Sequence, residues 1–200
     1  MDFDKSLNED RLQQLDDLVQ NMPPNSFLIT TFSATAGQYG NPAHRVARLD
    51  DLFGFAMPSV TTEDVRDEVG LGGVLARALL DRLVALSVQA GRPPAIPCFR
   101  LCYRDGAMMV TIGIFLPDEK SEGLVRDVVR AENWCGIVED PVTTPPLTPR
   151  EVTALRALLP ADSSLTRDDV LACGFDLEDD QISLFSKYYL RFPIFAQLAL

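Results

Sequence analysis

The sequence predicts an α+β protein with a small antiparallel sheet, packed helices and a helical C-terminal part. Three observations lead to this prediction. Two runs rich in β-forming residues flank the dipeptide Asp105-Gly106, which is typical of hairpins. Apolar residues recur at helical spacing within residues 12–22 and 62–88. After the proline-rich segment 141–147, the chain carries helix caps and helical patterns.

The first third of the chain predicts a helix, a strand and a loop. Ser6 and Glu9 form a capping-box pattern before apolar residues at helical spacing, which are Leu12, Leu15, Val19 and Met22. The stretch Ser26–Ala34 is rich in β-formers and predicts a strand. Residues 35–45 contain two glycines and predict a loop, and residues 46–57 fit either a short helix or an irregular segment.

The middle of the chain predicts two helices and then a hairpin. Thr61 or Thr62 caps a helical pattern that the sequence GLGG, residues 70–73, interrupts. Residues 98–116 then predict two strands, and the second is apolar on both faces, as expected of a central strand. A short helix over 121–133 and a strand over 134–140 complete the predicted core.

The last quarter predicts helices only. Thr148, Pro149 and Glu151 form a capping box with proline at the first helical position. The acidic stretch 176–180 could bind Mg²⁺. It fits better as a helix start, with Asp176 as N-cap and Glu178, Asp179 and Asp180 in the first turn. We therefore predict an α+β core over residues 1–142 and a helical subdomain over 146–200, packed on that core.

Composition narrows the classes of function. The formal net charge of −11 disfavours binding to nucleic acid or to anionic lipid. Four cysteines without a zinc-like spacing and a single histidine predict no metal site, and no motif calls for a cofactor. The cysteines are expected to be reduced, buried thiols, and the acidic N-terminus lacks an apolar signal core, so we expect a cytoplasmic protein without a membrane span.

Residues 61–116 resemble the winged helix-turn-helix family in outline. Val65 and Val69 match the first helix, Gly70 matches the turn, and the hairpin matches the wing. The resemblance implies a transcriptional regulator that contacts DNA through four arginines, namely Arg77, Arg82, Arg100 and Arg104. However, Gly72 and Gly73 occupy the start of the matching recognition helix, where base-reading side chains are needed. Two core helices are therefore the preferred interpretation.

A small enzyme is a further alternative, because residues 37–45 follow a strand and contain the only histidine. The candidate catalytic residues there are Tyr39, His44 and Arg45, although no nucleophile can be assigned to His44.

The C-terminal segment is rich in aromatic residues and is expected to dock on the protein's own core or on a partner. Its candidate interaction residues are Phe185, Tyr188, Tyr189, Phe192 and Phe195. Together with the acidic surface, they lead to the primary prediction, a non-catalytic adaptor that acts through a protein partner or self-association.

Overall fold

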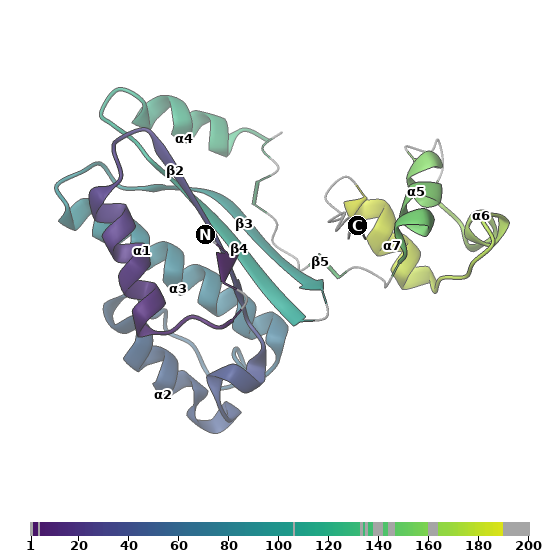
Figure 1. Ribbon diagram of the computed structural model, residues 1–200, viewed down its shortest axis with the longest axis horizontal. Coiled ribbons are helices and arrows are strands. Elements are labelled where there is room, and N and C mark those ends of the chain that lie inside the picture. Colours follow the sequence, from purple (N-terminus) through teal and green to yellow (C-terminus); the bar gives the residue numbers. More distant parts are fainter. Residues whose placement is uncertain are drawn as a thin grey trace, which may run out of the picture. The chain divides into compact units, whose positions relative to one another are not determined.

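The computed structural model describes residues 2–3, 5–105, 107–132, 134, 136–137, 142–143, 147–159 and 164–189. The chain forms two compact units, Met1–Pro141 and Val142–Leu200. The first unit combines a sheet with packed helices and confirms the predicted α+β class (Figure 1). In chain order, its elements are β1 (Asp2–Phe3), α1 (Glu9–Asn21), β2 (Ser26–Ser33), the 3-10 helix η1 (Ala36–Tyr39), α2 (Pro42–Phe53), the 3-10 helix η2 (Gly54–Ala56), α3 (Glu68–Gln89), β3 (Ile96–Asp105), β4 (Ala107–Leu116) and α4 (Glu122–Arg130).

Strand β4 lies at the centre of the sheet, as its apolar pattern predicted. It pairs antiparallel with β3 on one side and with β2 on the other, and the two-residue β1 adds a parallel pair to the outer edge of β2. Thr111 of β4 faces Thr31 of β2 and Leu101 of β3. The hydroxyls of Thr31 and Thr111 lie 2.9 Å apart and form a cross-strand hydrogen bond.

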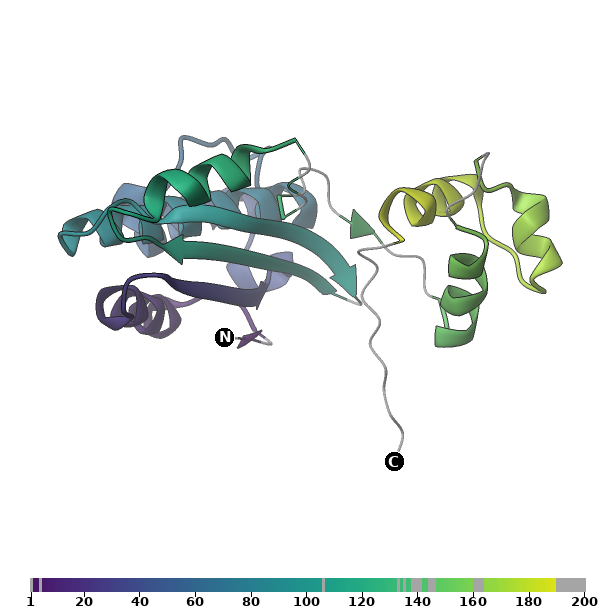
Figure 2. The same cartoon turned by 90° about the horizontal axis from the view of Figure 1, so that it is seen from above.

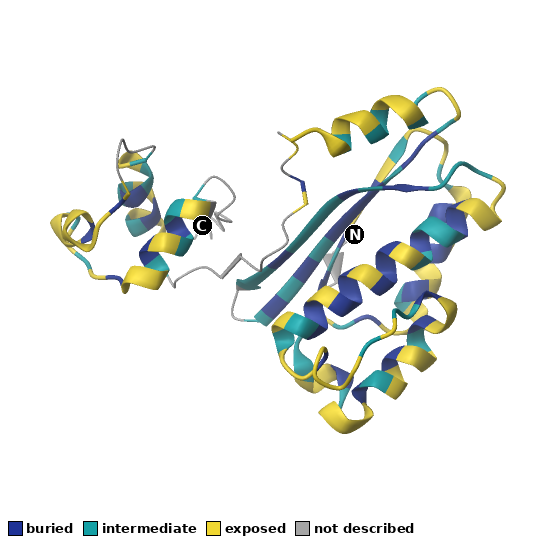
Figure 3. Cartoon of the chain, turned by 180° about the vertical axis from the view of Figure 1, so that it is seen from behind, coloured by how far each residue is buried: buried dark blue, intermediate teal, exposed yellow. Residues whose placement is uncertain are grey.

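One face of the sheet forms the hydrophobic core with α1 and α3. Alternate residues of β4 point into this core because side chains on a strand alternate between the two faces of the sheet. Helix α3 supplies much of the opposing surface, and Figure 3 shows its buried residues along most of its length. Helix α4 runs beside the strands of the sheet in Figure 2 and contacts β3. None of its residues is buried, so it contributes nothing to this core.

Helix α3 is one continuous helix, so the prediction of two helices interrupted at residues 70–73 is wrong, and the winged helix-turn-helix resemblance fails with it. Residues 62–67 form turns, and the Asp67 side chain caps the helix by accepting a hydrogen bond from the Gly70 amide. The glycines inside α3 do not break the helix, and two of them, Gly70 and Gly72, lie close to neighbouring atoms. A Cβ on Gly70 would lie 2.3 Å from the Asp64 carbonyl oxygen, and one on Gly72 would lie 3.4 Å from the Val110 side chain.

Three other local expectations need correction. The N-cap of α1 is Asn8, whose side chain accepts from the Arg11 amide, and not Ser6. Residues 35–45 are not a loop throughout, because η1 occupies their middle and α2 begins at Pro42, behind the capping side chain of Asn41. Of the predicted strand 134–140, the described residues show only an isolated bridge between Ile137 and Arg100.

The second unit contains β5 (Val142–Thr143), α5 (Pro149–Ala157), α6 (Arg167–Ala172) and α7 (Asp179–Tyr188). The predicted capping box of α5 is confirmed, since the Thr148 amide donates to the Glu151 carboxylate and the Glu151 amide donates to the Thr148 hydroxyl. The described helices surround a small apolar core, which consists of Val152, Leu155, Leu165, Val170, Leu177, Ile182 and Phe185.

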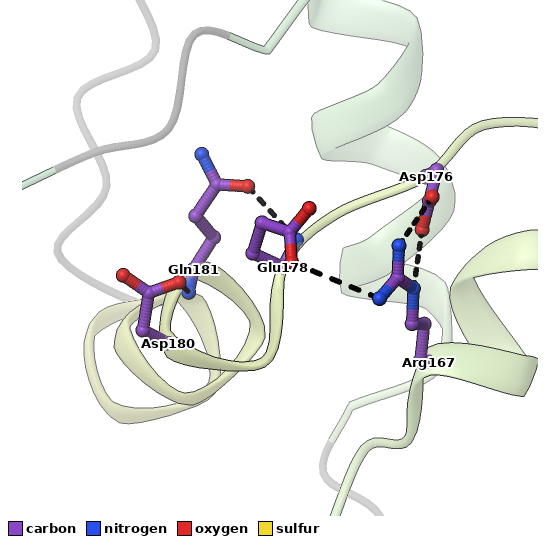
Figure 4. Close-up of polar contacts among 5 residues, drawn as sticks. All are labelled: Arg167, Asp176, Glu178, Asp180 and Gln181. Carbon is purple, nitrogen blue, oxygen red and sulfur yellow. Dashed lines mark hydrogen bonds and ion pairs between the residues drawn. The ribbon is translucent and has the colours of Figure 1, made fainter.

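Helix α7 begins two residues later than the sequence predicted. Glu178, rather than Asp176, is the N-cap, and its amide donates to the Gln181 side chain at 3.0 Å. Asp176 instead accepts two hydrogen bonds from Arg167, at 2.8 and 2.6 Å (Figure 4). These bonds and the guanidinium charge hold the pKa of Asp176 below its usual value.

Candidate functional site

The most promising site in the first unit is an open cavity of about 560 Å³ at the start of α3, which we call the acidic pocket. The segment after η2 forms one wall and the first three turns of α3 form the other. Three carboxylates, one arginine and several apolar side chains line it. The lining residues are Pro58, Ser59, Val60, Glu63, Asp64, Asp67, Val69, Gly70, Gly73, Val74 and Arg77.

A tight turn fixes two of the three carboxylates. Asp64 accepts hydrogen bonds from the Thr61 amide at 2.7 Å and the Thr61 hydroxyl at 2.8 Å. These bonds, the amide bond first, lower the pKa of Asp64. Asp67 uses one oxygen to cap Gly70 at 2.8 Å. Because a carboxylate has about four acceptor positions, both side chains keep acceptor capacity for a ligand.

Glycine shapes the helical wall of the acidic pocket. Gly70 allows the turn to approach the helix backbone, since any Cβ there would collide with Asp64. A Cβ on Gly73 would meet no atom within 4 Å, so this glycine leaves open space beside the cavity. The sequence contains this signal as carboxylates at 63, 64 and 67 followed by glycines at 70 and 73. The sequence-based interpretation used the glycines only as an interruption between two helices and gave the carboxylates no role.

The candidate catalytic residues of the 37–45 segment do not converge on one another. Tyr39 is buried, and its hydroxyl accepts from the Leu7 amide at 2.9 Å and donates to the Ser33 carbonyl at 3.2 Å. Burial raises the pKa of Tyr39 further above the neutral range. His44 is exposed on the first turn of α2. Their assignment as catalytic residues stays a prediction.

Arg45 is the third residue of that group, and it is 2% exposed. Its guanidinium donates to main-chain carbonyl oxygens from two separate segments of the chain. The acceptors are Val65, Arg66, Ala36 and Gly40. Arg45 therefore connects η1 to the turn that carries the acidic pocket's carboxylates.

The arginines assigned to DNA contact are mostly held by carboxylates. Arg82 forms a close ion pair with Asp16, and Arg104 lies 2.9 Å from Glu68. Arg77 is exposed, borders the acidic pocket and lies 3.9 Å from Asp81. Arg100 is partly buried on β3. With α3 continuous, these residues do not form the base-reading surface that the winged-helix interpretation requires.

The aromatic residues of the C-terminal segment divide into two groups. Phe185 is fully buried in the core of the second unit, and Tyr189 packs against the same core. The Tyr188 side chain, Phe192 and Phe195 lie outside the described residues. Their proposed role in interaction stays a prediction.

Other chemistry is scarce in the part of the chain that the structure describes. It contains no group of three or more His, Cys, Asp or Glu side chains placed to hold a metal ion. Cys98 and Cys102 are buried, unpaired thiols, and burial raises the pKa of Cys102 to about 11, so this thiol stays protonated at neutral pH. None of the described helices is both long and apolar enough to cross a membrane.

Comparison with known proteins adds one finding. A family model with the description "Putative O-methyltransferase" matches residues 1–200. No curated protein and no solved structure matches the chain. The family match contradicts the primary prediction of a non-catalytic adaptor acting through protein contacts, and it points to a small enzyme instead.

Proposed function

Since the chain belongs to that O-methyltransferase family, we propose that it transfers a methyl group to an oxygen atom and binds its methyl donor in the acidic pocket. This location for the methyl donor is supported by one observation, the combination of carboxylates and apolar side chains in a single cavity of about 560 Å³. Nucleoside cofactors in doubly wound proteins lie at the carboxyl ends of parallel strands. The three long strands here are antiparallel, so a turn and a helix start would hold the donor instead.

The lining residues fit S-adenosylmethionine, the common methyl donor of such enzymes, by their chemistry. This donor is a sulfonium cation with a ribose diol, and it supplies an electrophilic methyl group. Glu63, Asp64 and Asp67 offer negative charge near a cation and acceptors for ribose hydroxyls. Val60 and Val74 offer apolar surface for a flat base.

The remaining lining groups suggest how the chain's own residues would act. The turn bonds of Asp64 and the cap bond of Asp67 hold both carboxylates in place before a ligand arrives, which lowers the entropic cost of binding. Gly73 leaves open space beside them. Arg77 adds one positive charge at the helical wall, suited to a carboxylate of the donor or of the acceptor.

A binding experiment with a charge-matched control tests this proposal. The double variant E63Q/D67N removes two charges from the acidic pocket but keeps side-chain size, and asparagine is as good an N-cap as aspartate. We expect its affinity for S-adenosylmethionine in calorimetry to fall at least about tenfold, or 1.4 kcal/mol, relative to the unmodified protein.

The control is E9Q/D10N, which removes two charges from a separate cavity of about 440 Å³ between α1 and α2. Its affinity should stay within about twofold of the unmodified protein, a difference well below 1.4 kcal/mol. Equal losses in both double variants would place the donor elsewhere. An unmodified protein that binds no S-adenosylmethionine and methylates no oxygen acceptor would refute the proposed activity itself.

Two further expectations from the sequence accompany this proposal. The buried, unpaired thiols of Cys98 and Cys102 support a reducing, cytoplasmic location. Self-association or a protein partner remains compatible with an enzyme, and mass measurement in solution would detect it.

A further inference from the structure

Arg45 is an unusual buried cation. It projects from α2, is 2% exposed, and its hydrogen bonds go to main-chain carbonyl oxygens. The distances from its guanidinium are 3.1 Å to Arg66, 3.2 Å to Ala36 and 2.9 Å to Gly40, with a further close bond to Val65. Its Nε atom is buried without a hydrogen-bond partner among the described residues. Burying a guanidinium is unfavourable, and its hydrogen bonds to these carbonyl oxygens offset the cost.

Two of the carbonyl oxygens that Arg45 binds belong to the turn beside the acidic pocket. The Val65 and Arg66 carbonyls lie between Asp64 and Asp67, the two carboxylates that the turn presents to the acidic pocket. A planar guanidinium that donates to both neighbouring carbonyls fixes the orientation of the peptide groups between these two aspartates.

Glu68 also contacts the η1 segment. Its carboxylate accepts from the Ala36 amide at 3.2 Å and lies 2.9 Å from Arg104 of β3. Arg45 bonds the carbonyl of the same Ala36. Glu68 thus binds the amide of Ala36, and Arg45 binds its carbonyl. Through these two contacts, η1 is connected to the first residue of α3 and to the turn before it.

We infer that Arg45 is a positioning residue for methyl-donor binding, which holds the 61–67 turn so that Asp64 and Asp67 face the acidic pocket. The effect on donor binding rests on the proposed function, whereas the claim that Arg45 holds the turn can be tested without it. Arg45 acts through main-chain carbonyls and does not itself line the cavity.

The test compares Arg45→Lys with Arg92→Lys. Arg92 makes the same kind of contact far from the acidic pocket, donating to the carbonyls of Val19, Met22 and Gln20 at the end of α1. A lysine ammonium is a point charge that cannot reproduce either planar network. Both variants should therefore melt at a lower temperature, and binding is measured well below the lower melting point.

Two readouts distinguish positioning from general stability. The Arg66 amide donates to the Glu63 carbonyl, and the Gly70 amide donates to the Asp67 side chain. In Arg45→Lys, hydrogen exchange should become faster at these two amides. In Arg92→Lys, exchange at the same amides should not change. The affinity for S-adenosylmethionine should fall at least about tenfold in Arg45→Lys and should not fall in Arg92→Lys. Losses of this size are typical when a residue that orients a ligand-binding side chain is replaced, as at metal sites.

The outcomes separate the two ideas. Unchanged exchange at Arg66 and Gly70 in Arg45→Lys would overturn the inference, as would equal affinity losses in the two variants. If the unmodified protein binds no S-adenosylmethionine, the proposed function fails, while faster exchange confined to the turn would still establish that Arg45 holds it.

Discussion

Arg82 of α3 and Asp16 of α1 form a bidentate ion pair, with Nε–Oδ1 and Nη2–Oδ2 distances of 3.0 and 2.5 Å. The side chains are 19% and 7% exposed, so solvent screens the pair weakly. The pair therefore links α1 to α3 through a contact that is largely shielded from solvent.

Breaking this ion pair on one side should destabilise the first unit. Asp16→Asn leaves the Arg82 guanidinium without its carboxylate, which we expect to lower the free energy of unfolding by about 3 kcal/mol. Denaturant titration measures the loss. The double variant D16L/R82L removes both charges and should lose much less, because no unpaired charge remains. A double variant as unstable as Asp16→Asn would show that packing, rather than charge pairing, dominates at this position.

Acid should weaken the junction between β2 and α4 through Asp118. The Asn25 side chain is the largest cause, followed by Ser121, and together they lower the pKa of Asp118 to about 2. Because the folded pKa lies below the unfolded value of about 3.9, this stabilisation is present above pH 4 and is lost as the pH falls towards 2.

The measurement for Asp118 is the urea midpoint between pH 7 and pH 2.5, in the unmodified protein and in Asp118→Asn. The difference between the two should shrink on acidification, since only the unmodified carboxylate takes up a proton. Asp127→Asn, an exposed carboxylate of α4, controls for net charge. A difference that stays constant with pH would contradict the role assigned to Asp118.

The sheet should tolerate no side chain at Gly113 of β4. A Cβ there would lie 2.9 Å from the Cβ of Phe99 and 3.2 Å from the ring of Phe27. Gly113→Ala should therefore cost about 1–3 kcal/mol of stability through overpacking. Gly123→Ala is the matched control, because its Cβ would meet nothing within 4 Å and alanine favours the helix by up to about 1 kcal/mol. Equal melting temperatures for the two variants would contradict this packing.

The elements that sequence alone predicted are those with local causes. The hairpin of β3 and β4 follows from alternation around a turn dipeptide, and the start of α5 follows from Thr148 and Glu151. The failure at residues 70–73 has a distant cause. Gly72 faces Val110, which lies 38 positions further along the chain, and a Cβ on Gly72 would lie 3.4 Å from the Val110 side chain. Sequence periodicity cannot distinguish a glycine that breaks a helix from one that lets a helix approach a sheet.

The candidate site was only partly predictable for a related reason. Sequence analysis selected Arg45 as a polar residue near a histidine, but its acceptors are carbonyls up to 21 positions away. The sequence-based interpretation gave the carboxylates of the acidic pocket no role and expected Thr61 or Thr62 as the helix cap, whereas the N-cap of α3 is Asp67. Only the folded turn shows that the same side chains border a cavity.

The pairing of β2 with β4 also bears on how the protein is made. Ser33 pairs with Met109 and Ser26 with Leu116, so β2 is synthesised long before its neighbour. At about 5–20 residues per second, β4 follows roughly 4 to 18 s later. The β3–β4 hairpin, in contrast, can close within about 1–10 μs once both strands have emerged. The nascent N-terminal third therefore carries a strand with no long partner strand for several seconds, and such an unpaired edge is prone to aggregation during this interval.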